Sequence, residues 1–301
     1  MGDGLLPDAR APQHHLRFGL TLNHADIPPL KASALLKRYG LHADKRLGQN
    51  FLQDSNALEE IIRLAQIEPT DTVLEIGPGL GSLTRYLAVS AKQVVAVELD
   101  PNLLPPLKVV LAPHKNIRLI NADILQLSPS QIIDQPDYLV VANIPYYITS
   151  AIIRHLLESE RKPRRIVLTI QKEVAERICA KPGDLSLLAL SVQVYGQPSI
   201  EARIPAEAFF PAPTVDSVVL NIEIYPEPLI PSGSLKTFFQ LIKAGFGQKR
   251  KTLRNSLSAG LHIAPAESAS LLEKAEIDPM RRAETLSIPE WEKLTRLKED
   301  R

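Results

Sequence analysis

Asn143-Ile144-Pro145-Tyr146 is the segment of this chain whose residue types best suit chemistry on a nucleobase. An aromatic amine such as adenine N6 is a weak nucleophile because its lone pair is delocalised into the ring. The Asn143 side-chain oxygen and the Ile144 carbonyl could accept hydrogen bonds from the two N–H groups of this amine. These bonds would direct the nitrogen lone pair at an activated methyl group. Pro145 favours an extended Ile144 and adds no competing N–H. The segment therefore predicts methylation of an exocyclic amine.

Aromatic rings beside this segment offer stacking surfaces for a base. Tyr146 ends the segment, and stacking of a base on an aromatic side chain is worth roughly 1–3 kcal/mol. Phe209 and Phe210 are adjacent and are followed closely by rigid prolines. The two rings therefore cannot both point into the same hydrophobic core. We predict that Phe210 closes over the other side of the base. The alternative is that both rings pack inside a hairpin loop.

The predicted reaction needs little acid–base catalysis. After methyl transfer the nitrogen is strongly acidic and releases its proton to water, so proximity and alignment supply most of the rate enhancement. Alone, residues 143–146 are also compatible with an ordinary turn at the end of a strand, because Asn and Pro favour turns. A second group of residues favours the catalytic interpretation.

This second group begins at a glycine-rich turn. Residues 75–81 read EIGPGLG and lie between a predicted strand and a predicted helix. Glycines let a ligand approach the backbone, and the start of a helix supplies free N–H groups. Glu98 ends the next strand 19 residues after Gly79, where nucleotide-binding α/β folds place the carboxylate that accepts ribose hydroxyls. Gly77, Gly79 and Glu98 are therefore predicted cofactor contacts.

Two further strand ends favour S-adenosylmethionine over NAD as the cofactor. Asp123 follows the third predicted strand and could accept the exocyclic N–H of the cofactor adenine. Asn143 ends the fourth strand in a segment that a dehydrogenase would not require. We therefore predict that Asp123 and Asn143 also contact S-adenosylmethionine, and we predict no metal site.

Alternating strands and helices must position these residues. Short apolar strands separated by helices are typical of a doubly wound α/β sheet. Later in the chain, residues 199–204 and 215–224 predict two strands that could pair antiparallel to each other. Residues 186–195 fit either a helix or a strand. The predicted strands of the α/β part are 72–76, 93–98, 117–122, 138–142 and 165–170, and its predicted helices are 54–66, 82–89, 101–111 and 148–157.

Three segments are predicted along the chain. Residues 1–30 hold several prolines and no sustained helical period, which indicates a poorly ordered tail. Residues 31–228 form the predicted methyltransferase domain. After a linker rich in proline, residues 235–301 predict several short helices in a separate small domain.

Residues 232–260 contain Lys and Arg but no Asp or Glu. Such a stretch suits contacts with nucleic-acid phosphates, which contribute affinity and salt dependence. If residues 249 and 250 began a helix, the charges at 251 and 254 would share a face. The alternative is a helix whose charges are only solvated. Residues 161–165 and 45–46 could extend the basic surface. The predicted RNA-binding residues are Lys249, Arg250, Lys251 and Arg254.

Composition limits the partners and the compartment. The 301 residues carry 35 Lys and Arg against 34 Asp and Glu, so any affinity for nucleic acid must come from local clusters. One cysteine, Cys179, excludes an intramolecular disulfide framework and fits a reducing compartment. No apolar run reaches the ~18 residues of a membrane span. We expect a cytoplasmic monomer without membrane contact.

Several stretches, in their order, resemble the KsgA/RsmA family of small-subunit ribosomal RNA adenine dimethyltransferases. They also resemble, more loosely, the Erm enzymes and relatives of mitochondrial transcription factor B. The likeness covers roughly residues 36–291. Its motifs are LGQNFLQD (47–54), LEIGPGLGSLT (74–84), VELD (97–100), NIPYYITS (143–150), FFPAPTVDS (209–217), FGQKRKTLRNSL (246–257) and IDPMRRAETLS (277–287).

The resemblance implies a Rossmann-like catalytic domain with a small all-helical C-terminal domain. It implies the transfer of two methyl groups to N6 of each of two adjacent adenosines near the 3′ end of 16S rRNA, within the small ribosomal subunit. It adds Asn50 and Leu52 to the cofactor contacts, although the residues alone indicate only a loop there. Ile144 in the second place of the target-base motif is a mild departure that leaves its carbonyl available.

Two other functions stay open at this point. A DNA adenine N6-methyltransferase would use the same logic to orient the amine. A non-catalytic ribosome assembly factor could keep the fold as a scaffold. The intact glycine turn, Glu98, Asp123 and Asn143 argue against the scaffold.

Overall fold

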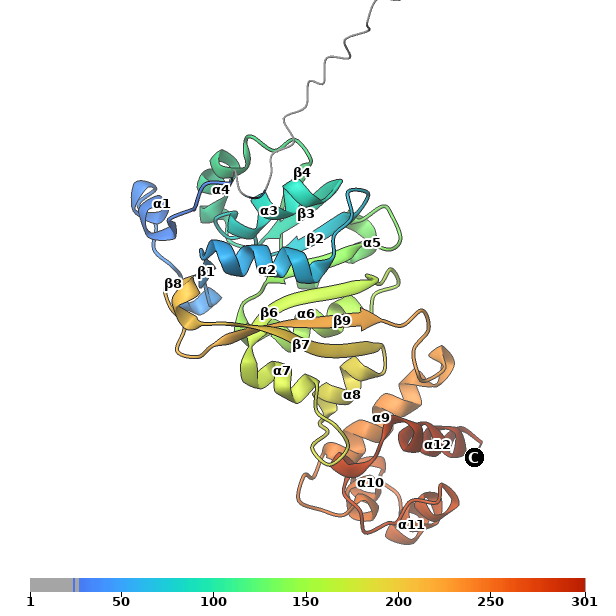
Figure 1. Ribbon diagram of the computed structural model, residues 1–301. Coiled ribbons are helices and arrows are strands. Elements are labelled where there is room, and N and C mark those ends of the chain that lie inside the picture. The colour runs from blue at the N-terminus through green and yellow to red at the C-terminus, as the bar shows by residue number, and fades with distance from the viewer. Residues whose placement is uncertain (1–23, 25–26, 301) are drawn as a thin grey trace, which may run out of the picture.

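A computed structural model of the chain describes residue 24 and residues 27–300, and its centre is a seven-stranded sheet (Figure 1). The strand order is β4-β3-β2-β5-β6-β9-β7. The first five strands in this order are parallel, whereas β9 runs antiparallel to both β6 and β7. The strands are β2 (Thr72–Ile76), β3 (Gln93–Glu98), β4 (Ile117–Asn121), β5 (Leu139–Asn143), β6 (Arg165–Gln171), β7 (Gly196–Ile204) and β9 (Ser217–Ile224). The predicted doubly wound sheet and the late antiparallel pair are both confirmed.

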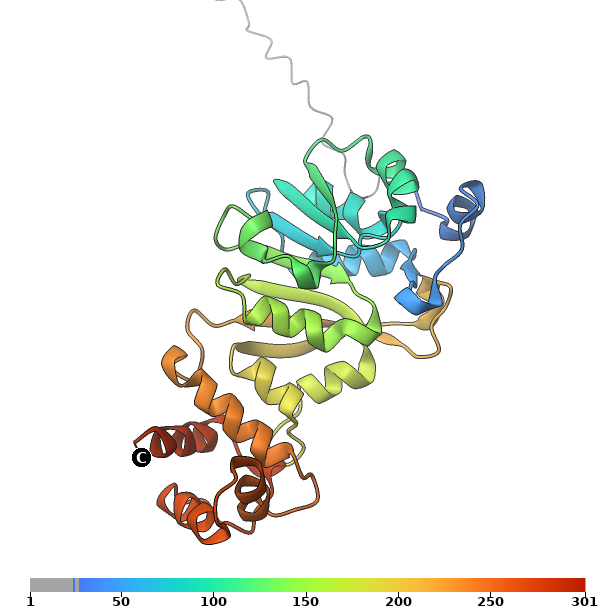
Figure 2. The same ribbon diagram turned by 180° about the vertical axis from the view of Figure 1, so that it is seen from behind.

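Helices cover the sheet on both faces, which explains the continuous apolar runs of the central strands. Alternate residues of each strand belong to different apolar clusters. Val73 and Val141 pack with α2 (Ser55–Ala65) and α3 (Ser82–Ser90). Leu74 and Val140 pack with α6 (Thr149–Leu157) on the opposite face, which Figure 2 shows from behind. The remaining helices of this part are α4 (Leu104–Leu111), α5 (Pro129–Ile132), α7 (Lys172–Ile178) and α8 (Leu187–Gln193).

Local sequence explains where several helices begin. The Asp54 side chain accepts a hydrogen bond from the backbone N–H of Ala57 at 2.8 Å and so caps α2, the helix predicted over residues 54–66. Ser186 caps α8 in the same way through Ala189 at 3.1 Å, which decides the region left open between helix and strand. Helix α7 was not predicted.

An arm formed by residues 27–54 lies against the carboxyl ends of the strands. It contains α1 (Ala32–Arg38), a 3₁₀ turn (Lys45–Leu47) and β1 (Phe51–Leu52), which pairs antiparallel with β8 (Phe209–Phe210). Of the predicted tail, residues 1–23, 25 and 26 lie outside the described part. Ile27 is buried, and the Pro28 carbonyl accepts a hydrogen bond from Arg85 at 2.8 Å.

Four helices form the end of the molecule that carries the C-terminus (Figure 1). They pack around fully buried Trp291 and Phe238. They also share an apolar cluster with α8, and the Tyr195 and Phe239 rings stack with centroids 6.3 Å apart. In residues 24 and 27–300, no helix combines the length and apolarity needed to cross a bilayer. The four are α9 (Leu235–Phe246), α10 (Leu253–Leu261), α11 (Pro265–Lys274) and α12 (Ile288–Glu299).

Candidate active site

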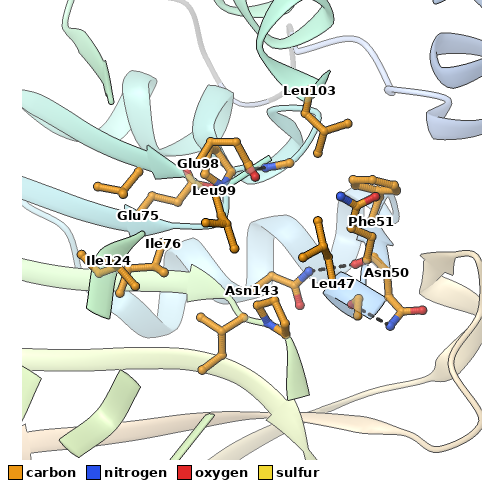
Figure 3. A pocket seen from close by; sticks show the side chains of 18 of the residues that line it. Leu47, Asn50, Phe51, Glu75, Ile76, Glu98, Leu99, Leu103, Ile124 and Asn143 are labelled. Carbon is orange, nitrogen blue, oxygen red and sulfur yellow. Dashed lines mark hydrogen bonds between the residues drawn. The ribbon is translucent and has the colours of Figure 1, made fainter. Parts of the chain in front are cut away.

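A pocket lies where β2, β3 and β5 end, closed on one side by the arm (Figure 3). The neighbours of β2 are β3 on one side and β5 on the other, so chain order reverses here, and ligands of open α/β sheets bind at such points. Its space is about 980 Å³, part of it open to solvent. The predicted site residues that line it are Asn50, Leu52, Gly77, Gly79, Glu98, Asp123, Asn143, Ile144, Pro145 and Tyr146.

The glycine turn follows β2 and adopts a backbone that side chains disfavour. Gly77 and Gly79 have φ of 70° and 58°, in the left-handed region. A Cβ on Gly79 would also lie 3.0 Å from the Phe51 ring. The turn therefore brings bare backbone to the pocket and lets the arm pack closely over it.

Glu98 is a buried carboxylate held by backbone groups. One of its oxygens accepts a hydrogen bond from Gly79 N at 2.9 Å, and the other accepts one from Asp100 N at 2.8 Å. Burial raises the pKa of this carboxyl. Each oxygen keeps a second lone pair, so the carboxylate can still accept two ribose hydroxyls.

Glu75 is a pocket-lining carboxylate that was not predicted as a site residue. It is fully buried, and its Oε2 has no hydrogen-bond partner among the residues that the structure describes. Burial, and to a lesser extent the nearby Glu98 charge, raises the pKa of Glu75 to about 8. A buried carboxylate with one oxygen that lacks a partner fits a cationic ligand, and S-adenosylmethionine carries an ammonium and a sulfonium. The residues present therefore fit this cofactor.

Asn143 ends β5 with its amide tied to the arm. The Asn143 Nδ2 donates a hydrogen bond to the Asn50 carbonyl oxygen at 3.1 Å, a contact drawn in Figure 3. This bond sets the amide orientation and leaves Oδ1 available as an acceptor. Ile144 is buried and Pro145 is extended, with φ of −60° and ψ of 135°. The arrangement can present acceptors to an exocyclic amine.

Tyr146 is held in place by Ser217, which was not predicted as a site residue. Its hydroxyl lies 2.7 Å from the Oγ of Ser217, which is fully buried at the start of β9. Burial raises the pKa of the Tyr146 phenol. Ser217 ends the FFPAPTVDS motif, which was the available signal.

The other predicted site residues differ in how they meet the pocket. Asp123 is half-buried and accepts a hydrogen bond from Leu125 N at 3.0 Å through one oxygen. Leu52 is buried on β1. Phe210 lies opposite Phe51 on β8, is half-buried against the arm, and is not among the described residues that line the pocket. This position favours packing over contact with a base.

The predicted RNA-binding residues lie together but away from the pocket, at the helical end of the molecule (Figure 1). Lys249, Arg250 and Lys251 are exposed. They occupy a turn between α9 and α10, so the helix considered for residues 249–251 is wrong, and only Arg254 lies on α10. Arg254 is half-buried, with its Nε 3.3 Å from the Asn255 side-chain oxygen.

Comparison with known proteins gives consistent results over most of the chain. Residues 40–294 match the profile of a family described as ribosomal RNA adenine dimethylase. The ribosomal RNA small subunit methyltransferase A of Dehalococcoides mccartyi is 49% identical over 273 residues, which cover 90% of this chain and 94% of the relative. The protein of the same name from Bacillus cytotoxicus is 41% identical, with 89% and 95% covered.

Solved structures agree with this match. The 23S rRNA methyltransferase ErmE superposes with a TM-score of 0.66 at 29% identity, covering 83% of this chain and 100% of its own. A dimethyladenosine transferase from Plasmodium falciparum gives a TM-score of 0.69 at 25% identity, with 81% and 95% covered.

Proposed function

Because the chain belongs to the ribosomal RNA adenine dimethylase family, we propose that it dimethylates N6 of two adjacent adenosines near the 3′ end of 16S rRNA. The resemblance to the KsgA/RsmA family inferred from the motifs is confirmed. The protein is an S-adenosylmethionine-dependent rRNA adenine dimethyltransferase. The two particular adenosines and the roles of individual residues are our proposal.

One observation carries the assignment of roles. The Asn143 amide, which would orient the target amine, lines the same pocket as Glu98 and the glycine turn. Its bond to the Asn50 carbonyl leaves the Oδ1 acceptor free. Cofactor and target base would therefore meet at the end of β5.

The cofactor supplies an electrophilic methyl group when bound. Glu98 would hold the ribose hydroxyls, Asp123 the adenine amine, and Glu75 the ammonium group. The backbone of the glycine turn at residues 77–81 would contact the remaining part of the cofactor.

The target adenine would stack on Tyr146, whose ring Ser217 holds in place. The Asn143 Oδ1 and the Ile144 carbonyl would accept hydrogen bonds from the two N6 hydrogens and so would fix the direction of the nitrogen lone pair. The proton that N6 loses on methylation would leave to water. Alignment of the reactants supplies the main acceleration.

The exposed Lys249, Arg250 and Lys251 would contact rRNA phosphates, and half-buried Arg254 would extend this surface. Residues 31–228 would bind the cofactor and target base, and residues 235–301 would add RNA affinity. We also propose, from its small-subunit substrate, that the protein acts in the cytoplasm, and that it acts as a monomer.

Transfer of radiolabelled methyl groups tests this function. Immature 30S particles and duplex DNA are offered separately, and the labelled 16S rRNA is mapped by mass spectrometry. We expect dimethyladenosine at two adjacent positions near the 3′ end. Label in DNA alone would favour a DNA methyltransferase, and binding to 30S particles without label would favour an assembly factor.

A further inference from the structure

Tyr147 is an exposed aromatic residue at the mouth of the pocket. Its exposed fraction is 59%, yet it lines the same pocket as Asn143 and Tyr146. Tyr146 is half-buried and bonded to Ser217, whereas the Tyr147 hydroxyl has no hydrogen-bond partner within the described residues. The two neighbouring tyrosines thus have opposite surroundings. Packing in the core does not explain why an aromatic residue stands at position 147.

The Tyr147 ring rests on Gly48 of the arm. Gly48 has φ of 61°, and a Cβ at this position would lie 3.3 Å from Cδ1 of the Tyr147 ring and 3.3 Å from Cβ of Pro145. The missing side chain lets the ring lie against the arm backbone. The ring is therefore supported from one side, while more than half of its surface faces solvent.

Two positively charged residues lie on the turn that leads into Gly48. Gly48 ends the 3₁₀ turn Lys45–Leu47, and both Lys45 and Arg46 are exposed. Asp44 is the acid of this turn and pairs with Arg46 at 2.9 Å, yet the Arg46 side chain stays 89% exposed. Exposed aromatic rings combined with exposed cations are what proteins use to hold unstacked nucleotides.

We propose that Tyr147, resting on Gly48, is a stacking platform for a nucleotide adjacent to the target adenosine. Lys45 and Arg46 would contact its phosphates. The inference rests on the proposed function, because extruding the target base into the pocket leaves its neighbour without a stacking partner on that side. An aromatic face at the mouth replaces the lost stack, and it accepts any base because every base has a π face.

Methyl transfer into immature 30S particles tests the platform. We expect Tyr147→Leu to raise the KM for the particles about tenfold, as loss of one stacked base predicts. Tyr147→Phe keeps the ring and should stay within about twofold of the wild type. Cofactor affinity, measured by calorimetry, should be unchanged in both variants. Tyr225→Leu, a half-buried tyrosine just beyond β9, is the matched control.

The phosphate contacts have a separate measurement. Lys45→Ala combined with Arg46→Ala should reduce the salt dependence of particle binding, by about 0.7 per lost contact in the slope of log affinity against log salt. An unchanged KM for Tyr147→Leu, in a wild-type background that methylates the particles, would overturn the platform and leave the function standing. A KM that rises equally in Tyr147→Phe would also overturn it. A wild type that methylates no rRNA would instead refute the proposed function.

Discussion

The pocket and the basic turn at residues 247–252 both carry polar side chains, but the pocket holds its polar groups in fixed positions, whereas the turn leaves them exposed. In the pocket, Glu98 accepts two backbone hydrogen bonds, and Asn143 donates to the Asn50 carbonyl. On the turn, the side chains of residues 249–251 are exposed and form no ion pair within the described part of the chain. Fixed groups set the geometry of a reaction, whereas exposed charges add affinity in small, salt-dependent steps.

Residues 161–165 show that a basic sequence alone does not tell whether its side chains are fixed by partners or exposed to solvent. Arg164 pairs with Asp71 at 2.8 Å, and the Asp71 side chain is only 6% exposed. Burial opposes ionisation of Asp71, but the hydrogen bonds from Arg164 and the Glu68 N–H, together with the arginine charges, outweigh it and lower the pKa of this carboxyl. Arg165 pairs with Glu223 at 2.5 Å. These two arginines therefore hold the fold together, and the basic surface considered from sequence does not extend through them.

Asn143→Ala should give the largest effect, because it removes a fixed acceptor for the target amine. We expect the rate of methyl transfer to fall about 100-fold or more, in the range found when one aligned hydrogen-bonding group is lost. Binding of 30S particles should change little. Single-turnover transfer and particle binding measure the two quantities.

Asn116→Ala is the matched control for this change. The Asn116 amide also donates to backbone carbonyls, those of Ala88 and Ala91, but at the opposite end of the sheet. Equal loss of transfer and particle binding in Asn143→Ala would mean that Asn143 supports the fold rather than the reaction.

Glu98→Ala should weaken cofactor binding about 30-fold, because two charge-assisted hydrogen bonds to the ribose are lost. The substitution also leaves the Gly79 and Asp100 N–H groups without their acceptor, so thermal stability without cofactor is measured alongside. Calorimetric titration measures the affinity, and an unchanged value would remove Glu98 from the site.

Charge reversal at Lys249, Arg250 and Lys251 should lower RNA affinity about tenfold at moderate salt and flatten its salt dependence. Cofactor affinity should not change. Arg164→Gln is the counterpart from the buried pair, and it should lower stability while leaving the salt slope unchanged. Loss of RNA affinity only in Arg164→Gln would reverse our assignment of the two basic stretches.

The pH dependence of cofactor binding should give the smallest effect. The pKa of Glu75 is about 8, so its carboxyl is mostly neutral at pH 6.5 and increasingly charged towards pH 8. If the carboxylate binds the cofactor ammonium, affinity should rise several-fold over this interval, and Glu75→Gln should abolish the rise. Calorimetry at several pH values measures this, and a flat wild-type profile would contradict it.

The raised pKa of Glu75 also makes the stability of the cofactor-free protein depend on pH. Stability should fall with rising pH, whereas cofactor affinity should rise. The pKa of Glu75 is raised on folding, so its contribution to stability is full below its unfolded pKa and is lost as pH rises through 8. Glu75→Gln should make the cofactor-free protein less sensitive to pH between 5 and 8. Thermal unfolding across this interval measures the effect.

The alternating sheet and most pocket residues could be predicted from the chain alone. Strands such as Thr72–Ile76 and Gln93–Glu98 follow from local apolar runs, and their bounds agree with the structure. Since parallel strands end at one edge, the residues just after them must gather there. Glycines, Glu98, Asp123 and Asn143 were found in this way. The C-terminal helices also follow from local composition.

Contacts between distant segments were decided by the tertiary structure. The Asn50–Asn143 bond joins residues 93 positions apart, and the Tyr146–Ser217 bond joins residues 71 apart. The pairing of β1 with β8, which places the Phe210 ring on the arm, is of the same kind. Local patterns determine helices and strands because they depend on neighbours within a few residues. Whether a carboxylate oxygen such as Glu75 Oε2 is buried without a partner, or an arginine such as Arg164 is paired, depends on which remote segment packs against it.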